Sequence, residues 1–225
     1  MVEDQILKRI YPSVVTFMGD WRKMLADVNR LKLKEISVFL TGAIITERKK
    51  IYQTLDKSTV KFIPHVHARH DMAEWEFDYF IKNFGTKAFT LHFQYLKYLK
   101  NSKHLEKIFI ENNIASHKIK NLKPLKKVGG LCIDLSHYIE LKHHNQELHD
   151  MTVAARKLYK VGCNHLSAVL PNKRSVHKVS KLSDLDYVAD IPQKYFSKYI
   201  CLELMDSIPE QLKFKQYIAK TLAQN

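Results

Sequence analysis

The chain has 225 residues, which is enough for one large domain or two small ones with a substantial hydrophobic core. Hydrophobic residues make up 45% and charged residues 27%, with only 6 glycines and 6 prolines, and this composition excludes a disordered, collagen-like or linker-like chain. Lys and Arg number 37 against 23 Asp and Glu, and the resulting net charge of +14 favours anionic partners such as nucleic acid or phosphorylated metabolites.

No apolar run approaches the roughly 18 residues of a membrane span, and the acidic start, Met1-Val2-Glu3-Asp4, lacks the apolar core of a secretion signal. The cysteines are odd in number and widely spaced, which fits neither a disulfide framework nor a structural zinc knot. They are expected to be small core residues: Cys132, Cys163 and Cys201. These features predict a cytoplasmic protein with no membrane partner and no evident obligate protein partner.

Short apolar stretches rich in β-branched residues recur along the chain, separated by longer segments with helical periodicity. A helical stripe of Trp21, Met24, Leu25 and Val28 follows the first stretch. Gly85 and Gly162 are expected to end helices. Residues 171–198 carry charges, serine and two prolines, and are expected to be mostly loop. The predicted strands are, in chain order, 11–17, 36–42, 60–67, 88–93, 107–112, 130–135, 163–169 and 199–204.

This alternation of strands and helices predicts a parallel sheet covered by helices. Eight such units in 225 residues suit a compact, single-domain (β/α)8 barrel of the TIM type, residues 1–225. The alternative is an open, doubly wound sheet, in which polar groups gather at one switch point of the strand order. Here polar groups follow the strands from the third to the eighth, and only a closed barrel brings so many strand ends around one pocket.

Each of these later strands ends in side chains that can ligate a metal. His65 and His67 end the third strand two residues apart, so they share one face. The others are, in chain order, His92 on the fourth strand, Glu111 on the fifth, Asp134 with His137 on the sixth, His165 on the seventh and Glu203 on the eighth.

The charged groups follow about three apolar residues each, and an isolated carboxylate in such a place would be expensive to bury. The cost falls if the carboxylates and imidazoles converge on a divalent cation, and such a ligand set suits Zn or Mn. A single His at a strand end is more often a hydrogen-bonded core residue, and a sugar or phosphate pocket without metal is the alternative. Because consecutive strands each deliver such a group, we expect a site for one to two divalent ions.

The strand-end motifs resemble those of the xylose isomerase-like barrel superfamily, which includes endonuclease IV-type enzymes and sugar isomerases and epimerases. The resemblance covers nearly the whole chain through its strand ends rather than through continuous identity. It implies metal ligands at Glu111, at Asp134 and His137 in Asp-x-x-His, at His165 in His-Leu-Ser, and at Glu203. His92 and one of His65 and His67 are similar to the extra histidines of the endonuclease IV branch.

Two departures from the superfamily pattern bear on the number of metals. Ala168 follows His-Leu-Ser, where the superfamily usually has Asp or Asn. The Asp-x-His motif that completes a third metal position in the endonuclease branch is missing, and the next candidates, His177, Asp184 and Asp186, have a different spacing. A three-metal site is therefore not expected.

Three functions fit this pattern. The first is a metal-dependent hydrolase of the endonuclease IV-like branch that acts on a phosphodiester or a phosphorylated sugar. The second is a sugar or sugar-phosphate isomerase or epimerase with one divalent metal, in which Glu111 and Glu203 exchange the substrate proton as base and acid. The third is a non-catalytic barrel with a degraded metal site. We favour the first, because the histidines on the third and fourth strands widen the ligand set and the positive charge suits a phosphorylated sugar or nucleic acid.

Three cations are candidates for contacting the substrate phosphate. Arg69 stands at a strand-to-helix turn, and Lys173 and Arg174 follow the seventh strand; for each, a solvated surface position is the alternative. A helix face packed against the barrel is expected after the fourth strand, formed by Tyr95, Tyr98 and Leu99, with a base-stacking platform as the alternative.

Overall fold

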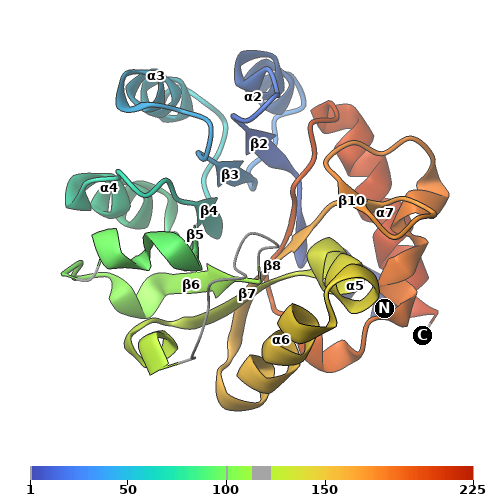
Figure 1. Ribbon diagram of the computed structural model, residues 1–225. Coiled ribbons are helices and arrows are strands. Elements are labelled where there is room, and N and C mark those ends of the chain that lie inside the picture. The colour runs from blue at the N-terminus through green and yellow to red at the C-terminus, as the bar shows by residue number, and fades with distance from the viewer. Residues whose placement is uncertain (1, 100, 113–122, 225) are drawn as a thin grey trace.

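Parallel strands form one sheet that curves into a nearly closed barrel, with helices around its outside (Figure 1). The computed structural model describes residues 2–99, 101–112 and 123–224. The sheet has nine strands in the order β1-β11-β8-β7-β6-β5-β4-β3-β2, so the predicted α/β barrel of the TIM type is confirmed. The strands are β1 (Ile10–Tyr11), β2 (Ser13–Val15), β3 (Ser37–Phe39), β4 (His65–His67), β5 (Ala88–His92), β6 (Ile108–Glu111), β7 (Gly130–Asp134), β8 (Val161–Leu166) and β11 (Ile200–Leu202).

The first predicted strand is divided at Pro12 into β1 and β2. β1 pairs with β11, whereas β2 pairs with β3. Proline has no N–H to donate to a neighbouring strand, but the Pro12 carbonyl accepts a hydrogen bond from the Ser37 N–H at 2.9 Å. The two ends of the sheet are therefore separated by a single residue, and the eight predicted strands become nine.

The helices have clear start and stop signals. The Asp20 side chain caps α2, and the predicted stripe from Trp21 to Val28 is buried. Gly85 ends α4 in the left-handed conformation, with φ of 65°, as predicted. The helices are α1 (Val2–Leu7), α2 (Trp21–Arg30), α3 (Ile45–Asp56), α4 (Glu74–Phe84), α5 (Leu135–His144), α6 (Gln146–Leu158) and α7 (Ile208–Ala223), with 3-10 turns η1 (Phe93–Tyr98), η2 (Leu105–Lys107), η4 (Lys123–Lys127), η5 (Leu182–Asp190) and η6 (Gln193–Tyr195). Within the described ranges, no helix combines the length and the apolar character needed to cross a bilayer.

Gly162 does not end a helix, so that prediction is wrong. The preceding helix α6 ends at Leu158, and Gly162 lies inside strand β8. A Cβ atom at this position would stand only 2.0 Å from the ring of Phe109. The glycine is therefore required by the close approach of an aromatic ring, which the local sequence does not reveal.

The seventh predicted strand, 163–169, is shorter than expected at its end. β8 stops at Leu166, and Ala168–Val169 forms β9, which pairs antiparallel with β10 (Ser175–Val176) outside the barrel sheet. Residues 171–198, expected to be mostly loop, contain no α-helix, but they hold β10, the nine-residue 3-10 helix η5 and the short turn η6. The residues after β8 thus leave the barrel wall.

Candidate metal centre

Imidazole and carboxylate groups meet at the C-terminal end of the barrel, where the parallel strands deliver their last side chains. The donor atoms within each group lie within 4.8 Å of one another, and all of these residues are buried. The three overlapping groups are His67, Glu111 and His165; Glu111, Asp134 and His137; and Asp134, His165 and Glu203. Buried His, Glu and Asp side chains in this arrangement could hold a metal ion.

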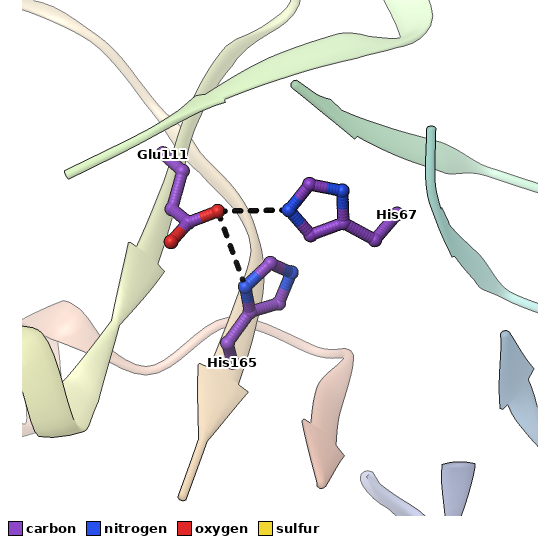
Figure 2. A group of neighbouring side chains, drawn as sticks. All are labelled: His67, Glu111 and His165. Carbon is purple, nitrogen blue, oxygen red and sulfur yellow. Dashed lines mark hydrogen bonds and ion pairs between the residues drawn. The ribbon is translucent and has the colours of Figure 1, made fainter. Parts of the chain in front are cut away.

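Glu111, the last residue of β6, lies at the centre of the cluster. Its Oε2 is 3.0 Å from His67 Nε2, 3.3 Å from His92 Nε2 and 3.6 Å from His165 Nδ1. Its Oε1 is 3.4 Å from His137 Nδ1. Figure 2 shows His67 and His165 directed at the same carboxylate oxygen from two different strands. One carboxylate therefore faces four imidazoles, which are supplied by three strands (β4, β5 and β8) and one helix (α5).

The ring of His67 is oriented so that Nε2 is available as a ligand. Its Nδ1 lies 3.2 Å from the Ala68 carbonyl oxygen and its Nε2 lies 3.0 Å from Glu111 Oε2, and both oxygens can only accept. Burial lowers the pKa of His67, so the neutral ring has one proton for these two oxygens; when Nδ1 donates it to Ala68, the Nε2 lone pair faces the Glu111 carboxylate. Two electron-rich atoms 3.0 Å apart need a proton or a cation between them. A backbone carbonyl on the far nitrogen is also the usual second contact of a metal-bound histidine.

Asp134 joins the end of β7 to the start of α5. Its Oδ1 accepts hydrogen bonds from the His137 N–H at 2.8 Å and from the Ser136 hydroxyl at 2.6 Å, and so caps the helix. Its Oδ2 is left to face His137 Nδ1 at 3.3 Å. The Asp-x-x-His spacing places a helix cap and a first-turn histidine together, which is why both side chains reach the cluster.

Four buried side-chain atoms of the cluster that could ligate a metal have no hydrogen-bond partner in the part of the chain that the structure describes. They are Asp134 Oδ2, His137 Nδ1, His165 Nδ1 and Glu203 Oε2. Buried polar atoms without partners are costly and rare in native proteins. Instead these atoms face one another, with His165 Nδ1 3.3 Å from Glu203 Oε2. Coordination of a divalent cation would satisfy them, so the residues present fit a metal.

His65 lies beneath this cluster rather than among its donor atoms. Its Nε2 is 2.8 Å from Thr90 Oγ1 and 3.1 Å from His165 Nε2. Burial, together with the charge of His165, holds the pKa of His65 well below its ordinary value, so His65 is neutral. A neutral His65 accepts the His165 Nε2–H and leaves Nδ1 of His165 directed at the carboxylates. Of the two histidines on β4, His67 contacts Glu111 and His65 supports His165.

Replacing His65 with Ala is expected to weaken metal binding by roughly 10–100-fold, the range typical of lost outer-sphere partners of metal ligands. The His165 ring would lose the contact that fixes which of its nitrogens carries the proton. Metal titration with a competing chelator measures the change. The His144→Ala variant, on the exposed end of α5, should bind metal as the wild type does. Equal affinity of the His65 variant and the wild type would contradict the assigned role.

The carboxylates control the protonation of the imidazoles. Burial alone would lower the pKa of His137, but Asp134 and Glu111 outweigh it and raise the pKa to about 10. Burial is likewise outweighed at His165, where Glu203 and Glu111 raise the pKa to about 9. Burial opposes ionisation of Glu111, yet the surrounding histidines hold its pKa well below the ordinary value. In the absence of metal, His137 and His165 are therefore imidazolium ions paired with carboxylates at neutral pH.

Metal uptake is therefore expected to release protons at pH 7. A metal binds neutral imidazole, so His137 and His165 must each lose the proton that their raised pKa values retain. Affinity should rise as the pH increases from 7 towards 9–10 and level off above that range. Titration calorimetry in two buffers with different ionisation enthalpies measures the proton release. Identical apparent enthalpies in both buffers would show that the ligands are already neutral.

The three predicted phosphate contacts lie in different surroundings. Arg69, two residues after His67, donates to the Ala43 carbonyl at 3.1 Å and lines a cavity beside His67 and His92. Arg174 is ion-paired with Glu140 of α5 at 2.9 Å. Lys173, in the β9–β10 turn, lines a different cavity. Arg69 is thus the candidate cation that the structure places beside the cluster.

Two residues, Asn112 and His177, support the cluster in roles that local sequence patterns did not reveal. The Asn112 side chain donates to the Asp134 carbonyl at 3.1 Å and accepts from the Asp134 N–H at 2.6 Å, which fixes the end of β6 against the end of β7. His177 donates from Nδ1 to the carbonyl of Glu203 at 3.1 Å and packs on Phe17. Both hold the backbone of a cluster residue that is distant in sequence.

A comparison of the chain with protein-family models and with curated proteins finds no match. The fold and the cluster themselves define a TIM-type α/β barrel with buried His, Glu and Asp groups at its C-terminal end that could hold a metal ion.

Proposed function

We propose that this protein is a divalent-metal-dependent hydrolase that acts on a phosphodiester or a phosphorylated sugar. The observation that supports it most strongly is the position of Glu111, whose two oxygens face four imidazoles at 3.0–3.6 Å. Such a carboxylate, shared between several histidines, suits a site for more than one ion. Active sites of TIM barrels lie at this end of the fold.

Side chains of the cluster and its adjacent cavity would bind the metal and orient the substrate phosphate. His67, His92 and Glu111 would hold metal on one side of the cluster. The ligands on the other side would be Asp134, His137, His165 and Glu203. Divalent metal, zinc or manganese, supplies the activation of water and the neutralisation of phosphate charge. Arg69 would orient the phosphate from the adjacent cavity. The buried position of Glu111 and Glu203 excludes bulk water from the reacting groups.

A second candidate function is sugar or sugar-phosphate isomerisation. Glu111 and Glu203 both approach His165 Nδ1, at 3.6 and 3.3 Å, so the two glutamates could share one substrate between them. Metal content, measured by mass spectrometry of the purified protein, separates the candidates. About two equivalents of zinc would support the hydrolase, and one equivalent of manganese or cobalt would support the isomerase. No metal after supplemented purification would contradict both and favour a non-catalytic barrel.

Salt dependence provides a test of the nucleic-acid substrate. The net charge of +14 favours contacts with several phosphates, and each contact contributes a slope of about −0.9 to log affinity against log salt. We expect binding to an oligonucleotide with an abasic site to weaken about tenfold or more between 50 and 200 mM salt, if a few phosphates are contacted. Fluorescence anisotropy measures the slope. If abasic and nicked DNA fail to bind even at low salt, the nuclease proposal fails and the isomerase takes its place.

A further inference from the structure

A cavity of about 270 Å³ opens directly beside the metal centre. His67 and His92, which both contact Glu111, form its inner wall. Other parts of the wall are formed by Arg69, His70 and Tyr95. A ligand group in this cavity would therefore touch the metal-binding histidines at one end and an aromatic surface at the other.

The aromatic surface is a row of rings that starts at the metal centre. His92 and Tyr95 stack with ring centroids 5.9 Å apart and an interplanar angle of 22°. Tyr95 and His70 stack at 4.6 Å and 23°, and His70 contacts Tyr98 at 5.4 Å. The rings belong to β5, η1 and the loop after β4, so tertiary structure assembles the row.

The outer end of the row is open to solvent. Tyr98 is 58% exposed, whereas its neighbour Leu99 is buried and anchors the segment. The expectation that Tyr95, Tyr98 and Leu99 form one helix face packed on the barrel is therefore wrong for Tyr98: η1 is a 3-10 helix in which Tyr98 is exposed, while Leu99 directly after it is buried as expected. Lys97 Nζ lies 4.9 Å from the centroid of the Tyr98 ring, so a positive charge accompanies the exposed ring.

The loop that carries Arg69 and His70 is held by a buried ionic network. Arg48 of α3 is fully buried and donates to the Ala43 carbonyl and to Asp71 Oδ1, both at 3.0 Å. Arg69 donates to the same carbonyl and lies 3.6 Å from Asp71 Oδ2. The cation of the cavity wall is thus fixed before any ligand arrives, as a preorganised binding site requires.

We propose that this cavity and its ring row bind a nucleotide residue, with the phosphate at Arg69 and the metal centre and the base stacked on Tyr98. The assignment rests on the hydrolase function proposed above and specifies its substrate class. Every nucleobase offers a π-face, so an exposed tyrosine binds it without sequence preference. A sugar phosphate alone would use Arg69 and the metal centre but would leave the ring row without a ligand.

Adenosine 5′-monophosphate and ribose 5-phosphate test the assignment, because they share the sugar phosphate and differ in the base. Their dissociation constants are measured by calorimetry on the metal-loaded wild type and on Tyr98→Ala, Tyr98→Phe and Trp75→Ala. Trp75 is a matched control, since it is 46% exposed, lies on α4, and makes its ring contact with Tyr52, which is not part of the ring row. Metal content and cleavage of an abasic-site oligonucleotide are recorded for the same preparations.

We expect the wild type to bind the nucleotide at least about fivefold more tightly than the sugar phosphate, the lower range for stacking of one base. Tyr98→Ala should remove this preference with metal content unchanged, Tyr98→Phe should retain it, and Trp75→Ala should have no effect. Equal affinities in the wild type, binding of neither ligand, or a preference that survives in Tyr98→Ala would overturn the assignment. If the preference depends on Tyr98 but no oligonucleotide is cleaved, the hydrolase function fails while the nucleotide site stands.

Discussion

Replacing Glu111 with Gln is expected to abolish both metal binding and the proposed hydrolase activity. The substitution keeps the shape of the side chain but removes the only carboxylate that faces His67, His92, His137 and His165 within 3.6 Å among the described residues. A lost outer-sphere partner costs roughly 10–100-fold in affinity, and loss of a central ligand should exceed that range. Metal content by mass spectrometry and cleavage of an abasic-site oligonucleotide measure the two effects.

Glu106→Gln is the matched control for this prediction. Glu106 is exposed and precedes β6, so the same chemical change is made at the opposite end of the same strand. It should leave metal content and activity unchanged. A Glu111→Gln protein that retains full metal content would show that the imidazoles alone hold the ion, and the central role of this carboxylate would be lost.

Replacing Arg48 with Met is expected to lower the free energy of unfolding by about 3–5 kcal/mol, the usual cost of removing one partner from a buried ion pair. Arg48 and Glu76 are both fully buried, and the guanidinium donates to the two Glu76 oxygens at 2.7 and 2.9 Å. The Tyr52 hydroxyl donates to the same carboxylate at 2.5 Å. Without Arg48, the Glu76 carboxylate would stay buried with its charge uncompensated.

Urea unfolding followed by circular dichroism measures this loss as a lower midpoint at an unchanged slope. The comparison variant is Arg30→Met, which breaks the exposed pair with Asp27 on one turn of α2 and should cost less than about 1 kcal/mol. A double variant, Arg48→Met with Glu76→Leu, should recover part of the stability because it removes both charges. Similar midpoints for Arg48→Met and the wild type would contradict the buried-pair account.

The fold and most of the candidate site could be predicted because they depend on topology alone. In a parallel barrel, all strands end at one face, so a carboxylate or imidazole that follows an apolar run must arrive there. Glu111, Asp134 and Glu203 each follow such a run, and their side chains do meet. The order and type of the predicted elements were therefore sufficient to predict that these carboxylates meet, without any knowledge of side-chain packing.

Other features of the fold and the site could not be predicted. They depend on how far along the barrel axis a side chain lies and on its contacts with residues of other strands. His65 and His67 lie on the same face of β4, because side chains alternate along a strand. Their contacts distinguish them: His65 lies against Thr90, whereas His67 lies against Glu111 and belongs to the cluster. Gly162 is explained by the ring of Phe109 on another strand. The guanidinium of Arg174 forms an ion pair with Glu140 of helix α5. None of these contacts leaves a signal in the neighbouring sequence.

The division of the first strand at Pro12 has a consequence for the order in which the protein is made. Among the residues that the structure describes, β1 pairs only with β11, whose residues leave the ribosome after all the other strands. Until then, a nascent barrel carries two open strand edges, which invite pairing with other chains. Glu203, directly after β11, arrives at the same moment. Closure of the barrel and completion of the metal centre are therefore one event, and a chain released before β11 would lack both.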